Sequence, residues 1–140
     1  MRLDPCPSEF RSVSLAVVND NGVGHQRGRL VPFDADRVLV CRYHGGNLNG
    51  FVHLAAQAAE AEVDDTNLLP QRLSPRNPCP SDESTYLITF WHATQRVVLK
   101  FTCPYVTNSF RIGLATRTWA NYLDFLIDDM QRAGRSSRSS

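Results

Sequence analysis

The sequence contains no apolar run that approaches the ~20 residues a helix needs to span a bilayer. Its opening residues, MRLDPC, lack the apolar segment of a secretory signal peptide. The formal net charge is only +1, which argues against a dedicated surface for nucleic acid or another polyanion. We therefore expect no membrane span and no nucleic-acid partner. The protein is either cytosolic or exported with its leader removed.

Recognisable catalytic and metal-binding motifs are also missing. There is no Cys-x-x-Cys spacing and the four histidines are scattered, so zinc is not expected. Asp64-Asp65, or Asp34 with Asp36, can in principle hold a divalent cation, but helix caps and solvated turns explain these acids better. The sequence thus predicts no metal, no cofactor and no enzymatic activity.

What the chain does contain is a strong hairpin pattern. Side chains alternate along YLITFWH at residues 86–92 and VVLKFTC at residues 97–103, with the β-branched and aromatic enrichment of strands. The link through residues 93–95 is short enough for a hairpin. Because the first segment is apolar on both faces, we expect a central strand covered on both sides.

The four cysteines fit this arrangement. Cys79 and Cys103 flank the hairpin, where they can be bridged if their Cα atoms come within ~7 Å. The second expected pair is Cys6 with Cys41, which would tie the N-terminal segment to a strand. The alternative is four reduced thiols, with Cys41 and Cys103 as ordinary buried strand residues. Disulfides would imply export, because they are rare in the cytosol.

The remaining chain predicts further strands at residues 12–18, 37–43 and 109–115, with turns or loops at 19–22, 44–50 and 104–108. Residues 51–69 are alanine-rich and predict a helix with an apolar stripe. Thr116 or Thr118 can cap a second helix. The stripe of the first helix comprises Phe51, Leu54, Ala55 and Ala58, and the apolar face of the second comprises Trp119, Tyr122, Leu123, Leu126, Ile127 and Met130.

These elements predict an α+β fold: a single two-layer domain with an antiparallel β-sheet of about five strands and two helices packed on one face. The domain is expected to span residues 1–133. Residues 134–140, GRSSRSS, are expected to be a flexible tail.

The segment at residues 70–83 has the most specific functional interpretation. It contains four prolines and no periodicity, and includes Pro80, Ser81, Asp82 and Glu83 beside Cys79. A proline-stiffened loop anchored by a disulfide can present a rigid peptide to a protein partner, because preorganisation lowers the entropic cost of binding. The same features also fit a structural crossover loop.

Two other groups of residues allow weaker hypotheses. A small hydrolase can pair His44 or His92 with Asp34 or Asp36. Aromatic residues can line a ligand cleft, although core packing is the simpler explanation for them. The histidines are His25, His44, His53 and His92, and the aromatic residues are Tyr86, Phe90, Trp91, Phe101 and Trp119.

Over residues 37–110 the pattern resembles a group of actinobacterial secreted proteins and lipoproteins of uncharacterised function. That group has a Cys-Arg-Tyr strand, a Cys-Pro-x-Asp segment, a hairpin, and a further cysteine followed by a turn of the Val-x-Asn kind. The resemblance implies export but no activity. The matching positions are Cys41, Arg42, Tyr43, Cys79, Pro80, Asp82, Cys103, Val106 and Asn108.

The order strand-Cys, alanine-rich helix, Cys-Pro, hairpin, Cys is also similar to the bacterial subtilisin inhibitor family. This resemblance implies a reactive site at or beside Ser81 and Asp82. Two features depart from the family: the helix carries no cysteine, and residues 81–84 are acidic and polar.

The sequence therefore predicts a secreted or cell-surface binding module with a protein partner. Its surface would be the 70–83 loop and the adjoining edge of the hairpin. The alternatives are a protease inhibitor acting through the same loop and a small hydrolase using a histidine.

Overall fold

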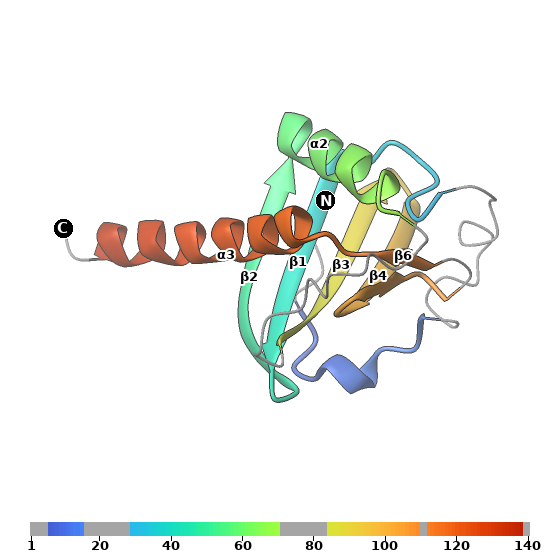
Figure 1. Cartoon of the computed structure of the whole chain (residues 1–140). Coiled ribbons are helices and arrows are strands. Elements are labelled where there is room, and N and C mark those ends of the chain that lie inside the picture. The colour runs from blue at the N-terminus through green and yellow to red at the C-terminus, as the bar shows by residue number, and fades with distance from the viewer. Residues whose placement is uncertain (1–5, 16–28, 71–83, 110–111, 139–140) are drawn as a thin grey trace.

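The computed structural model describes residues 6–15, 29–70, 84–109 and 112–138. In these residues six strands form one antiparallel sheet in the order β2-β1-β3-β4-β5-β6 (Figure 1). The predicted α+β class is confirmed, with one strand more than expected. The strands are β1 (Arg37–His44), β2 (Asn47–Ala55), β3 (Ser84–His92), β4 (Gln95–Thr102), β5 (Tyr105–Thr107) and β6 (Ile112–Leu114). The helices are the 3-10 turn η1 (Phe10–Ser12), α2 (Ala56–Asn67) and α3 (Arg117–Arg138).

The predicted hairpin is β3 and β4. Tyr86 pairs with Phe101, and His92 with Gln95, so the turn consists of residues 93 and 94 alone. β3 lies between β1 and β4, as expected for a strand that is apolar on both faces. β4 pairs with β3 along its length and with β5 at Lys100–Thr102. The end of the hairpin that adjoins the 70–83 segment therefore offers no free edge in the described residues, contrary to expectation; the outer strands of the sheet are β2 and β6.

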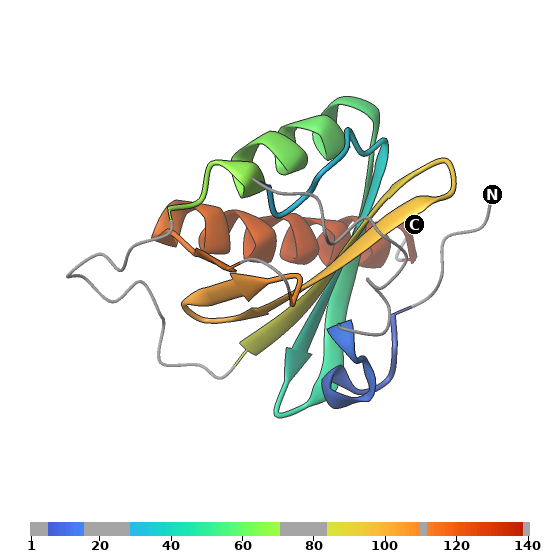
Figure 2. The same cartoon turned by 90° about the vertical axis from the view of Figure 1, so that its right-hand side faces the viewer.

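Both helices pack on one face of the sheet, as predicted (Figures 1 and 2). Alternating residues of the strands point toward the helices and form the larger core cluster. Burial of this apolar surface is the main stabilising contribution to such a two-layer domain. Its fully buried members include Val38, Val40, Ile88, Phe90, Val97, Leu99, Leu123 and Ile127.

The N-terminal segment covers the opposite face. There Cys6, Phe10 and Val13 pack against a second cluster of buried side chains. The disulfide Cys6–Cys41 joins this segment to the middle of β1, with Cα atoms 5.9 Å apart. This pair was predicted and is confirmed. The buried members of the cluster are Leu15, Leu39, Cys41, Tyr43, Leu87, Trp91 and Val98.

Residues 47–55 are a strand, whereas the sequence predicted a loop to residue 50 and a helix from residue 51. Gly45 and Gly46, with φ of +60° and +86°, form a tight turn that returns the chain along β1. Val52 and Leu54 then alternate with exposed neighbours, and pairing with β1 keeps residues 51–55 out of the helix that the following alanines form. The helix begins only at Ala56, so Phe51 is not on its apolar stripe and is 48% exposed. Ala55 and Ala58, also expected on that stripe, are exposed as well.

Three smaller predictions need correction. The strand expected at residues 12–18 is absent from its described part, where η1 ends at Ser12; residues 16–18 lie outside the described residues. The turn expected at residues 104–108 contains β5, and the final strand is only Ile112–Leu114. The loop expected at residues 19–22 lies outside the described residues.

The cap of α3 is confirmed at Thr116, whose Oγ1 accepts a hydrogen bond from the backbone N–H of Trp119 at 3.2 Å. Of the predicted apolar face, Tyr122 and Met130 are 43% and 49% exposed. The helix continues to Arg138, beyond the domain end expected at residue 133. Whether the last residues move independently stays a prediction.

α3 lies close to the sheet at Gly50. A Cβ at this position would lie 2.7 Å from both Gln131 Nε2 and Ile127 Cγ2. We expect Gly50→Ala to destabilise the fold by about 1–3 kcal/mol, because the helix must shift. Denaturant unfolding tests this, with Gly113→Ala as control: its closest contact is the flexible end of Leu30, at 2.8 Å. Equal effects of the two substitutions would contradict the account.

Candidate functional site

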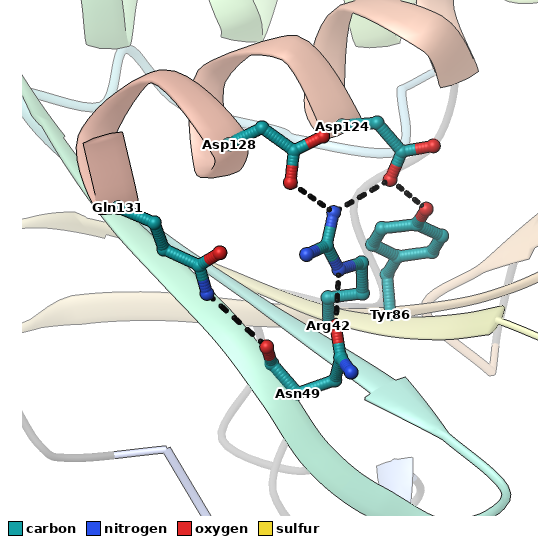
Figure 3. Close-up of polar contacts among 6 residues, drawn as sticks. All are labelled: Arg42, Asn49, Tyr86, Asp124, Asp128 and Gln131. Carbon is teal, nitrogen blue, oxygen red and sulfur yellow. Dashed lines mark hydrogen bonds and ion pairs between the residues drawn. The ribbon is translucent and has the colours of Figure 1, made fainter.

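A polar cluster joins α3 to the sheet at one end of the covered face (Figure 3). At its centre is Arg42 of β1, whose side chain is 11% exposed. Arg42 Nη1 lies 3.0 Å from Asp128 Oδ1 and 3.3 Å from Asp124 Oδ1, and Arg42 Nε donates to Asn49 Oδ1 at 3.0 Å. The Tyr86 hydroxyl also donates to Asp124 Oδ1. The cluster thus contains one cation, Arg42, which contacts both carboxylates.

The local folding of the chain explains this geometry. Asp124 and Asp128 are four residues apart and share one face of α3. Asn49 sits at a bulge in the pairing of β1 with β2, which brings its amide to Arg42. Its backbone carbonyl accepts a hydrogen bond from Gln131 Nε2 at 3.2 Å. The cluster therefore fixes the position of α3 over the sheet. Its charged and polar groups already have partners within the cluster.

Other positions of the Cys-Arg-Tyr … Val-x-Asn pattern also have structural roles. The Tyr43 hydroxyl donates to the Pro7 carbonyl at 2.7 Å, and burial raises the pKa of Tyr43 to about 12. Asn108 is buried and donates to the Leu30 carbonyl at 3.1 Å. These contacts explain the residue types at these positions by folding alone.

A cavity of about 360 Å³ opens between the end of α2 and the beginning of α3. Its walls are mostly apolar, with one carboxylate and two hydroxyl-bearing threonines. Sites for small ligands typically combine an apolar lining with a few placed polar groups. The cavity can therefore hold a small apolar molecule or a side chain of another protein. It is lined by Asp65, Leu68, Leu69, Thr116, Thr118, Trp119 and Tyr122.

A buried acid is linked to the cavity wall. Trp119 Nε1 donates to Thr66 Oγ1 at 3.3 Å, and the Thr66 hydroxyl donates to Glu62 Oε1 at 3.4 Å. Glu62 is 1% exposed, and its Oε2 has no hydrogen-bond partner in the described part of the chain. Burial, and then the charge of Asp65, raise the pKa of Glu62 to about 7, although hydrogen bonds from Thr66 and Trp119 oppose the rise. The Glu62 carboxyl is thus neutral below about pH 7.

This raised pKa predicts a pH dependence of stability. Between pH 4.5 and about 7 the unfolded chain releases the Glu62 proton while the folded chain retains it, so stability falls as pH rises through this window. We expect the loss to be about 3 kcal/mol.

Glu62→Gln should remove this fall of stability with pH. Compared with the parent chain, the variant should therefore lose less stability between pH 5 and pH 8. Denaturant unfolding at pH 5, 6, 7 and 8 tests this. The control is Glu60→Gln, an exposed acid on the same helix, which should leave the slope unchanged. A slope equally steep in Glu62→Gln and the parent chain would contradict the assignment.

The predicted binding residues Pro80, Ser81, Asp82 and Glu83, together with Cys79, lie outside the described residues. Both ends of their segment are held by the sheet. The Pro70 carbonyl accepts a hydrogen bond from Leu114 N–H at 2.7 Å, and Ser84 pairs with His44 at the end of β1. Cys103, at the end of β4, is disulfide-bonded. Its predicted pairing with Cys79 stays a prediction.

The histidines in the described part of the chain, His44, His53 and His92, do not converge on one site. His92 Nδ1 lies 3.9 Å from Asp36 Oδ2, so one pair of the hydrolase hypothesis is brought together, but both side chains are more than half exposed. His44 and His53 are exposed on other strands, Asp34 is exposed, and His25 lies outside the described residues. Within the residues that the structure covers, no three potential metal ligands gather.

The aromatic residues considered for a cleft are mainly core residues. Tyr86 stacks on Phe101 with ring centroids 5.2 Å apart, and Phe101 meets Trp119 edge-on at 5.0 Å. Of the five residues considered, only Trp119 lines the cavity. Residue spacing could not identify this cavity or the Arg42 cluster, because each joins segments far apart in the chain.

Comparison with known proteins finds no relatives. No family model matches the sequence. A search of curated proteins and a search of solved structures also find no match. In the described part of the chain, no helix has both the length and the apolar character to cross a membrane.

Proposed function

We propose that this chain is an exported, disulfide-stabilised binding module that acts through contact with a protein partner. The observation that carries the proposal is the Cys6–Cys41 disulfide, which fixes the N-terminal segment over one face of the sheet. Cys103 is also disulfide-bonded. Disulfides persist in oxidising compartments and are rare in the cytosol, so this use of cysteine favours export.

The 70–83 segment is the proposed contact surface. Its first residue, Pro70, is hydrogen-bonded to β6, and the residue that follows the segment, Ser84, pairs with β1. A segment with fixed ends loses less conformational entropy on binding than a free one, which favours recognition. The Arg42 cluster offers less to a ligand, because its groups are already paired.

An alanine scan of Pro80, Ser81, Asp82 and Glu83 tests this surface. A photocrosslinking side chain at residue 81 should capture a partner protein from the extracellular fluid around the producing cells. Alanine at residues 80, 82 or 83 should weaken that capture. Thr94→Ala, an exposed change in the turn at the other end of the hairpin, is the control. Unchanged capture in every loop variant would reject the loop as the contact surface.

A protease inhibitor is the second candidate. It is favoured by the fixed ends of the 70–83 segment and by the disulfide at Cys103, which together suit a loop that must resist cleavage. The bonding of Cys41 to Cys6 gives this candidate no further support. Titration against subtilisin-like and trypsin-like proteases tests this candidate. Complete lack of inhibition by the intact chain would reject the protease-inhibitor function.

A further inference from the structure

β2 is an edge strand of the sheet, with a bulge at Asn49. It pairs with β1 on one side, and on the other side Asn47 has the single bridge among the described residues, to Glu9. Edge strands usually carry lysine, proline or inward-pointing charge, which prevents another strand from pairing with them. Residues 50–55, GFVHLA, contain none of these. Phe51 is 48% exposed there, beside His53, with ring centroids 5.7 Å apart.

The helix α3 continues past this edge (Figure 1). Ile127 and Gln131 meet β2 at Gly50 and Asn49, so the helix crosses the edge strand at these residues. Residues 132–138 then extend about 10 Å further at the rise of an α-helix. This length corresponds to about two strand spacings of ~4.8 Å. Residues 130–138, which we call the overhang, therefore project beyond the β2 edge.

The overhang has a defined chemistry. Met130 lies three residues after the buried Ile127 on α3 and is 49% exposed. The sequence of the overhang, MQRAGRSSR, contains three arginines and no acid. The Arg132 side chain is 63% exposed and meets only Asp129, at 3.8 Å, among the described ion pairs. The surface formed by β2 and the overhang should therefore favour a ligand that carries apolar and acidic side chains.

We propose that β2 and the overhang receive an extended acidic segment of a protein partner, which adds to the sheet as a strand. Backbone hydrogen bonds to residues 50–55 supply affinity, as in other cases of strand addition. One apolar side chain of the segment packs under Met130, and a side chain on its other face packs against Phe51. An acidic residue of the segment pairs with Arg132. This inference rests on the proposed binding function and specifies the class of partner.

Selection of a random peptide library displayed on phage tests the proposal, with the full oxidised chain immobilised through its N-terminus. The enriched peptides should alternate apolar and polar residues and contain Asp or Glu. The best peptide is then synthesised, and its affinity for variants of the chain is measured by fluorescence polarisation. Met130→Ser and Phe51→Ser should each weaken binding about tenfold, and Arg132→Glu should do so most strongly at low salt.

Each of these variants has a matched control. Phe125→Ser changes an exposed aromatic residue on α3, and Ile112→Ser changes an exposed aliphatic residue on the opposite edge strand β6; both residues are 56% exposed. Arg117→Glu reverses an exposed charge at the other end of α3. All three controls should bind the peptide within about twofold of the parent chain.

The outcomes separate this inference from the proposed function. Failure to enrich any peptide, or affinities indifferent to Met130→Ser and Phe51→Ser, would overturn strand addition at β2. If binding is instead lost with alanine at Pro80 or Asp82, the inference is wrong while the binding module stands. A dimer in sedimentation that Phe51→Ser disrupts would show that a second copy of this chain binds at the β2 edge. This result would also overturn the proposal.

Discussion

Replacing Arg42 with alanine should lower the free energy of unfolding by about 2–3 kcal/mol. Arg42 is the cation between Asp124 and Asp128, and its side chain is 11% exposed. Its removal leaves the two acids facing each other, with Asp124 supported only by the Tyr86 hydroxyl among the contacts of this cluster. Because the aspartates are 36% and 55% exposed, water offsets part of the loss, which keeps the effect below that of a fully buried pair.

Urea unfolding measures this change, and Arg132→Ala is its control. Arg132 meets Asp129 at 3.8 Å with both side chains more than 60% exposed, so its removal should cost less than about 1 kcal/mol. A double-mutant cycle of Arg42→Ala with Asp128→Asn should show coupling between the two residues. Equal effects of the two arginine substitutions would show that the cluster does not hold α3 to the sheet.

Removal of the Cys6–Cys41 disulfide should have a still larger effect. The bond spans a sequence separation of 35, for which the chain-entropy relation gives about 4 kcal/mol. With both cysteines replaced by alanine, the N-terminal segment keeps only its noncovalent contacts, such as Phe10 with Tyr43. Local opening of this segment should then expose Trp91, which is 8% exposed in the intact fold.

Two readouts check this prediction: the free energy of unfolding and the emission wavelength of tryptophan under native conditions. Phe10→Ala in the intact protein is the control, because it removes packing on the same face and keeps the bond. A loss of less than about 1 kcal/mol in the double variant, with no red shift, would contradict the role assigned to the disulfide.

The hairpin could be predicted because its alternating pattern is local in the sequence. The Cys6–Cys41 pair could be predicted because few pairings are possible. Alternation from Tyr86 to Cys103 requires a strand period, and with four cysteines there are only three possible pairings. β2 was missed because Phe51, Leu54 and Ala55 have the i, i+3, i+4 spacing of a helix and lead directly into an alanine-rich segment. Whether Phe51 belongs to a strand or a helix depends on pairing with β1, which is a tertiary interaction.

The polar sites could not be predicted for a different reason. Nothing in the spacing of Arg42, Asp124 and Asp128 indicates that they meet, since two of them are on a helix and the third is on a distant strand. Glu62 looks like an ordinary surface acid of a helix that also carries Glu60, Asp64 and Asp65. Its burial depends on how α2 lies against Trp119, which is decided by packing between layers.

The arrangement of the sheet bears directly on where a partner can bind. One face is covered by α2 and α3 and the other by the disulfide-linked N-terminal segment, so the middle of the sheet is closed. The binding surfaces that we propose are the 70–83 segment and the β2 edge beside α3. Both depend on a rigid centre, to which the N-terminal disulfide contributes.

The state of the four cysteines tests the central claim most directly. The chain should be isolated without reductant from the cells that produce it, and its intact mass measured after alkylation before and after reduction. We predict that no cysteine is alkylated before reduction and that all four are alkylated after it, with a Cys6–Cys41 peptide on mapping. Four free thiols before reduction would contradict an exported, disulfide-stabilised module and place the protein in a reducing compartment.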